Sequence, residues 1–217
     1  MTTALLRYQT GLLLRSQRWL APLLLYAVFL AVGVRAGEPV LGALGYAAAV
    51  LLPVTAWVVR ICLTQEPVAA RNVVAAAAGR RRAHLAAVLA AVACAAPSGA
   101  VAVLGVTAVA DLRGVGPAEA VASGLLAATA CVLTGAAVGT LASRPLLRSR
   151  GWSLAALVLG SLLALVTTGS PAKHAVTGLV TGSRTTTVTM PWLALLGALV
   201  LAALAVAVSV RATARRE

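Results

Sequence analysis

The residues able to do chemistry in this 217-residue chain are few and widely spaced. Its two histidines, His84 and His174, fall on opposite sides of the apolar segments defined below, so we do not expect them to share a metal ion. Cys62, Cys94 and Cys131 have none of the short spacings typical of zinc ligands, and they lie in or near apolar runs. We expect them to be small buried hydrophobes, with no metal site and no disulfide framework.

Nucleotide and protease chemistry are not predicted either. The single lysine, Lys173, stands in Pro-Ala-Lys-His without the glycines that cradle phosphates, so we do not expect this chain alone to hydrolyse ATP by that route. Ser123, between Ala122 and Gly124, invites comparison with a rhomboid protease, but that chemistry needs a histidine on the last apolar segment, and residues 191–210 contain none. We predict no catalytic residue and interpret Ser123 as a packing residue.

The composition indicates what kind of fold holds these residues. Hydrophobic residues make up 61% of the chain, charged residues 11%, and the mean hydropathy is +0.97. A soluble domain is about half apolar and about one quarter charged. These values exclude a soluble enzyme, a disordered tail and a secreted disulfide scaffold, and they predict one multi-spanning membrane domain. The net charge of +13 comes from cations at the ends of apolar runs, so no nucleic-acid partner is expected.

Charged residues and histidines divide the chain into six long uncharged windows. Five contain 21 to 26 residues, and the first, after Arg18, contains 16 and is completed by an Arg35 that reaches the interface. None has the alternation of a transmembrane β-strand, and none holds an ionisable residue at its centre, which argues against proton- or sodium-coupled transport. We predict an all-α membrane protein, residues 1–217, with transmembrane helices at 19–37, 39–63, 85–110, 119–143, 151–170 and 190–210.

The cations also predict the orientation of these helices. With the N-terminus in the cytoplasm, fourteen arginines lie on the inner side and four cations lie outside, and cytoplasmic loops carry such an excess. Both termini are therefore predicted to be cytoplasmic. Seventeen of the eighteen cations are arginine, and alanine, valine and leucine dominate the apolar set, a usage that suggests a bacterial plasma membrane.

Residues 1–18 precede the first predicted span and form an amphipathic pattern. On a helical wheel Arg7, Arg15 and Arg18 gather on one side, whereas an opposite arc is apolar except for Gln9 and Ser16. The pattern predicts a helix lying in the inner interface, with a frayed N-terminus as the alternative. The apolar arc contains Leu5, Leu6, Tyr8, Leu12, Leu13, Trp19 and Leu20.

The longest inner loop, between the second and third spans, predicts a short helix. Thr64 or Glu66 is a suitable cap, Pro67 suits the first helical position, alanines follow, and Gly79 is a natural stop. We expect a helix over 67–78 on the cytoplasmic face. Its small alanine surface either docks in a groove of a partner protein or serves only as a connector.

Two further segments have a weaker signal. Residues 167–190, between the last two spans, are rich in glycine, serine and threonine, and they predict either a segment that dips back into the membrane or a solvated loop. Gly135 and Gly139 form a GxxxG pattern in the fourth span, which suggests close helix packing.

The order of these features resembles the membrane subunit of an ATP-binding cassette exporter of the ABC-2 type. The stretch from Glu66-Pro67 through Arg71-Asn72 to Gly79 and His84-Leu85 resembles the coupling-helix region of that family. Met190-Pro191-Trp192 and the basic tail 211–216 resemble the start and end of its last helix. The resemblance covers the whole chain and is one of organisation, with loose sequence.

The resemblance implies a mechanism and partners. Two membrane subunits, identical or different, would pair in the bilayer, and each would rest on a separate ATP-binding subunit that holds the ATP and magnesium. The substrate path would run at the dimer interface, and the small outer loops favour a small amphiphile, lipid or peptide. The alternative is a non-transporting assembly or scaffold subunit. The residues expected to contact the ATPase are Glu66, Arg71, Asn72, Ala75, Ala76, Gly79 and Arg80.

Overall fold

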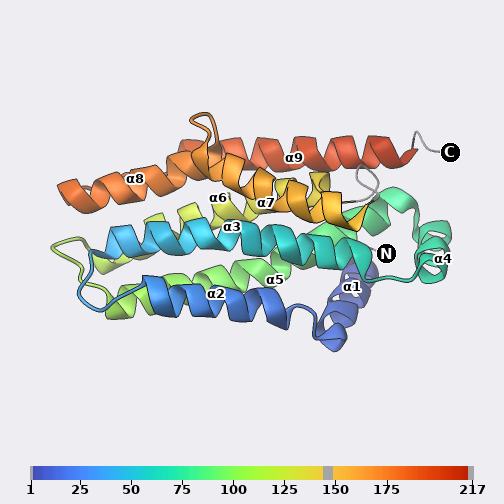
Figure 1. Cartoon of the computed structure of the whole chain (residues 1–217), viewed down its shortest axis with the longest axis horizontal. Helices are drawn as coiled ribbons and strands as arrows, with labels where there is room; N and C mark the ends of the chain where they lie inside the picture. The colour runs from blue at the N-terminus through green and yellow to red at the C-terminus, as the bar shows by residue number, and fades with distance from the viewer. Residues whose placement is uncertain (1, 144–148, 215–217) are drawn as a thin grey trace.

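The computed structural model describes residues 2–143 and 149–214, and the regular structure in these ranges is helical. The predicted inner-side cations at 144, 148, 215 and 216 lie outside the described residues. Figure 1 shows the helices running largely along one long axis. They are α1 (Thr2–Ser16), α2 (Leu20–Gly33), α3 (Val40–Thr64), α4 (Val68–Ala78), α5 (Arg80–Val109), α6 (Pro117–Leu141), α7 (Arg150–Val166), α8 (Pro171–Thr185) and α9 (Trp192–Ala214).

Four of these helices, α3, α5, α6 and α9, are individually long and apolar enough to cross a membrane. Two pairs reach that length only together: α1 with α2, bent by 70°, and α7 with α8, bent by 49°. The described chain therefore has four to six candidate spans, and the expected all-helical, multi-pass fold is confirmed. The six transmembrane helices predicted from the sequence correspond to the upper value of this range, in which each bent pair counts as one span.

The observed bounds differ from the predicted ones by four residues or more at four helices, of which α9 continues to Ala214 rather than ending at 210. α5 begins at Arg80 rather than at 85, so it carries the triple-arginine run and His84 within its first two turns. α2 has 14 residues, which is about 21 Å of helix and shorter than a hydrocarbon core of about 30 Å. α7 ends at Val166, four residues before the predicted end of its span.

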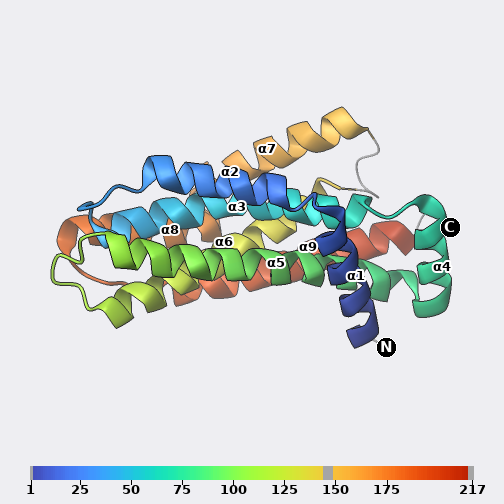
Figure 2. The same ribbon diagram turned by 90° about the horizontal axis from the view of Figure 1, so that it is seen from below.

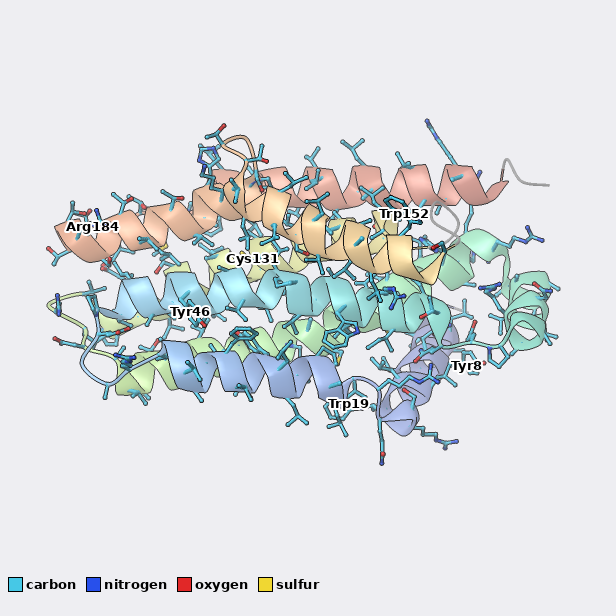
Figure 3. The ribbon with its side chains drawn as sticks, in the orientation of Figure 1. Tyr8, Trp19, Tyr46, Cys131, Trp152 and Arg184 are labelled. Atoms are coloured by element: carbon cyan, nitrogen blue, oxygen red, sulfur yellow. The ribbon has the colours of Figure 1, made fainter. Side chains whose placement is uncertain are left out.

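The helix α3 forms the centre of the bundle. It contributes most of the fully buried large side chains, including Leu44, Leu51 and Leu52, and it packs against α5, α6 and α8. Tyrosines attach α2 to it, because Tyr26 donates a hydrogen bond to the carbonyl of Ala47. Tyr46 of α3, labelled in Figure 3, donates one in return to the carbonyl of Phe29.

Two glycines let α6 approach the backbone of α3, as the GxxxG pattern suggested. A Cβ atom added at Gly139 would lie 2.7 Å from the carbonyl oxygen of Ala56, and one at Gly135 would overlap that of Leu52. Only a hydrogen fits at both positions. This contact joins the two most buried candidate spans.

The two ends of the bundle carry different short helices. Figures 1 and 2 show α1 and α4 at one end, near the last turns of α9; we call this the α4 end. The tip of α8, with Arg184 labelled in Figure 3, lies at the opposite end, which we call the α8 end. The segment predicted as a dipping or solvated connection is largely helical, because α8 buries Ala172, Ala175 and Leu179 against α3 and α6.

Candidate functional site

The helix predicted in the first inner loop exists, and its bounds are close to those expected. α4 covers Val68–Ala78, and Gly79 ends it with φ 84°, a conformation that favours glycine. The predicted caps are wrong. Pro67 occupies the N-cap position rather than the first helical position, and no side chain caps the helix. The hydroxyl of Thr64 instead donates to the carbonyl of Arg60, one turn back in α3.

The exposed face of α4 is small and nearly uncharged. Of the seven residues expected to contact an ATPase, Asn72, Ala76, Gly79 and Arg80 are exposed, whereas Glu66, Arg71 and Ala75 are half-buried. The structure adds Val73, which is 69% exposed between Asn72 and Ala76. Val73 could not be selected from the sequence, since it is one of three valines in an alanine-rich helix and has no distinctive spacing. We call Asn72, Val73, Ala76 and Gly79 the α4 face.

A polar contact joins α1 to the loop that leads into α4. The side-chain amide nitrogen of Gln9, a residue only 2% exposed, donates to Oε1 of Glu66 at 2.9 Å. Burial, followed by the nearby Glu66 carboxylate to which the phenol also hydrogen-bonds, raises the pKa of Tyr8 above its usual value. Gln9 Oε1 and both amide atoms of Gln65 are buried and unpaired in the described part of the chain. The bond between Gln9 and Glu66 thus holds the loop before α4 against α1, although neighbouring amide atoms of Gln9 and Gln65 lack partners there.

The apolar side of α1 packs against the protein most closely at Leu13. Leu13 is 1% exposed and belongs to a cluster with Val58, Val59 and Cys62 of α3 and Ala87 of α5. Gln9 is therefore part of the buried face, one helical turn before Leu13, and not an interruption of a lipid-facing arc. α1 is attached to the same helices that α4 connects, since α4 lies between α3 and α5 in the chain.

A second feature is the break between α7 and α8. Leu157 of α7 shares a buried cluster with Ala56, near the middle of α3. Farther along the chain, α8 places its Val176 carbonyl oxygen at 3.4 Å from a Cβ added at Gly45. Along the long axis, the break at 167–170 lies between these two levels and is level with the central part of α3, on the outer side of the bundle, as Figure 1 shows. Irregular backbone at such a depth in a membrane must be satisfied by protein or water.

Lys173 supplies a hydrogen-bond donor to one of the backbone carbonyls left free at this break. Its Nζ donates to the carbonyl of Val166, at the C-terminus of α7, at 2.6 Å, where a cation is favoured. The sequence placed Lys173 and His174 in an outer connection, whereas the structure places both in the first turn of α8, beside the bundle. The other histidine, His84, pairs with the hydroxyl of Ser209 at 2.8 Å and so links α5 to α9.

A cavity opens beside the break. It has a volume of about 710 Å³ and lies between the start of α8 and the first half of α9. His174, Gly178 and Thr189 belong to its wall, and they are shared with a smaller cavity of about 310 Å³ along α8. The other residues of the smaller cavity are Thr177, Thr181, Gly182, Thr185 and Thr187.

The cysteines carry no evident chemistry. All three are free thiols, with Cys62 and Cys131 buried and Cys94 half-buried. In the described ranges, no group of three or more histidine, cysteine or acidic side chains is placed to hold a metal ion. The α4 face and the cavity pair between α8 and α9 are therefore the two features that suggest a function.

Comparison with known proteins adds no identity to this geometry. No family model, no curated protein and no solved structure matches the chain.

Proposed function

We propose that this chain is the membrane subunit of an ATP-driven transporter of the ABC-2 type, with ATP and magnesium bound by a separate subunit. One observation carries the proposal. The helix α4 lies outside the candidate spans, contacts the rest of the bundle mainly through α5, and exposes a small, low-charge face. Such a surface suits a groove on a partner protein, since short side chains permit close approach and leave no charge unpaired.

The connections of α4 suit a role in transmitting force. Three residues, 65–67, separate it from α3, and Gly79 alone separates it from α5. A displacement of α4 therefore reaches both helices through very little intervening chain. α3 is the central helix of the bundle, so the displacement reaches the core directly.

The remaining parts of the proposal follow the resemblance. The α4 end is cytoplasmic, with both termini on that side; α1 lies in the inner interface of a bacterial plasma membrane. A second membrane subunit, identical or related, completes the translocation path. The transported molecule is a small amphiphile, lipid or peptide, moved outward.

The decisive experiment is co-purification of the tagged chain with an ATP-binding subunit from its native membrane. A variant then tests the contact surface. Ala76→Arg places a large cation on the α4 face, where docking would bury it without a partner, at a cost of several kcal/mol. The matched control is Ala4→Arg, which adds the same charge to an exposed alanine of α1.

We expect the Ala76→Arg chain to insert and fold normally but to lose the ATPase in pull-down and to lose substrate-stimulated ATP turnover in liposomes. The Ala4→Arg chain should retain both. Equal retention of the ATPase by the two variants would show that α4 is a passive connector, and it would favour an assembly or scaffold subunit.

A further inference from the structure

The two cavities that meet at His174 differ in chemistry. The smaller one is lined mainly by threonines from α8 and from the 186–191 segment. The larger one is lined on its α9 side by exposed apolar residues, among them Trp192, Leu193 and Leu204. Because they share His174, Gly178 and Thr189, they form one continuous depression that is polar toward the α8 end and apolar toward the middle of the bundle.

The polar part has hydrogen-bonding capacity to offer. The hydroxyls of Thr177, Thr181 and Thr189 make no hydrogen bond in the described part of the chain, whereas Thr185 and Thr187 bond to each other at 2.7 Å. A threonine hydroxyl both donates and accepts, so this wall suits a head group rich in oxygen.

The charges around the depression select against a cation. No carboxylate lines either cavity, and His174 lies where the two cavities meet. Lys173 lies next to it, with its ammonium on the Val166 carbonyl. A cationic head group would find no counter-ion in this wall, whereas a hydroxyl- or phosphate-bearing one would meet donors.

The apolar part is open on its side. Leu193 is 86% exposed and Leu204 is 58% exposed, and both lie on α9, the least buried of the four individually sufficient spans. A molecule can therefore enter laterally, with its chain against α9 and its head toward the threonines. The length of α9 agrees with this placement of head and chain. Its 19 residues from Trp192 to Val210 span about 28 Å, close to one hydrocarbon thickness, so Trp192 lies near one edge of the hydrocarbon.

We propose that this depression between α8 and α9 binds one amphiphile from the outer leaflet, with a non-cationic, oxygen-rich head among the threonines and an alkyl chain along α9. Binding at this site needs no ATPase partner and is tested separately from the transporter assignment; its place in the outer leaflet rests on the orientation given in the proposed function, with the α4 end cytoplasmic.

The test uses the full chain in phosphatidylcholine nanodiscs, with tryptophan quenching by a single-chain phosphatidylglycerol brominated on its alkyl chain. Trp192 lines the larger cavity, and its share of the quenching is the part lost in Trp192→Phe. A brominated alkyl trimethylammonium of equal chain length serves as the cationic probe. Thr177→Val with Thr181→Val removes two hydroxyls at nearly constant shape.

We expect the Trp192 component of the quenching to saturate with the phosphatidylglycerol probe, and the affinity for the cationic probe to be about tenfold lower. The double valine substitution should lower the affinity for the phosphatidylglycerol probe by about tenfold, as expected for two lost hydrogen bonds. The matched control, Thr107→Val with Thr129→Val, changes hydroxyls that bond their own helices, and it should bind normally.

Three results would each overturn the proposal. One is quenching that rises linearly without saturation and is unchanged in Trp192→Phe, as for ordinary boundary lipid. Another is equal affinity for the two head groups. The third is a quenching titration with the phosphatidylglycerol probe whose midpoint is the same in the double valine variant as in the wild type. None of these measurements requires ATP, so a negative result here leaves the pull-down result of the α4 variant intact.

Discussion

The contact between α3 and α6 makes the sharpest test of how this fold is held together. Gly139→Ala adds one methyl group, which would lie 2.7 Å from the Ala56 carbonyl oxygen and 2.9 Å from Cβ of Val59. Ordinary contacts of this type are longer, so the helices must separate by several tenths of an ångström. The neighbours are backbone and Cβ atoms, which have no alternative rotamer. Overpacking of this kind costs about 1–3 kcal/mol.

The matched control is Gly105→Ala. Gly105 lies within the long helix α5, and nothing lies within 4 Å of the position its Cβ would take. There the substitution should stabilise by up to about 1 kcal/mol, because alanine is the better helix former. The two variants differ only in what the added methyl meets, so their difference isolates the packing effect.

A double variant distinguishes one shared contact from two separate ones. Gly135 faces the Leu52 carbonyl one turn along the same helix, and one outward shift of α6 would relieve both overlaps. The cost of Gly135→Ala with Gly139→Ala should therefore be smaller than the sum of the single costs. Reversible unfolding in mixed micelles with increasing dodecyl sulfate, followed by circular dichroism, measures the stability of the wild type and of all four variants. Gly139→Ala matching Gly105→Ala in stability would refute the reasoning.

Three further predictions concern orientation and the α4 end. A cysteine at Arg184 should react with an impermeant thiol reagent in intact cells, whereas one at Arg81 should react only after lysis; labelling of both in intact cells would exclude the proposed orientation. Gln9→Leu should change the free energy of unfolding by less than about 1 kcal/mol, because it removes both the bond to Glu66 and an unpaired buried oxygen. It should nevertheless broaden the distribution of distances between spin labels placed on exposed alanines of α1 and α4. An unaltered distribution would mean that the contact does not hold the two helices together. Gly79→Ala forces a side chain into a conformation that costs about 1–3 kcal/mol, so amide exchange in α4 should accelerate, and equal exchange rates would show that α4 is held by other contacts.

The fold class and several elements could be predicted because their signals are strong and local. A long uncharged window has few interpretations at this composition, and the helix after Pro67 is bounded by a proline and a glycine. Its caps could not be predicted, because the Thr64 hydroxyl has a competing acceptor in its own helix.

The less predictable parts depend on contacts distant in sequence. α8 is a helix because Ala172, Ala175 and Leu179 bury against α3, although its glycines and threonines are poor helix formers. Gln9 is paired with a residue 57 positions away, so its role could not be inferred from a helical wheel. The cavity pair needs the return of the 186–191 segment along α8, which no residue spacing indicates.

The single residue between α4 and α5 makes α4 a short lever. With no linker, its direction is set by the two backbone torsions of Gly79, and its 11 residues give an arm of about 16 Å. A rotation of about 10° at that pivot would carry the far end through about 3 Å, roughly the length of one hydrogen bond. The far end is where Glu66 accepts its bond from Gln9. A swing of that size must therefore either pull α1 along or break this bond, so the position of α1 would depend on the angle of α4.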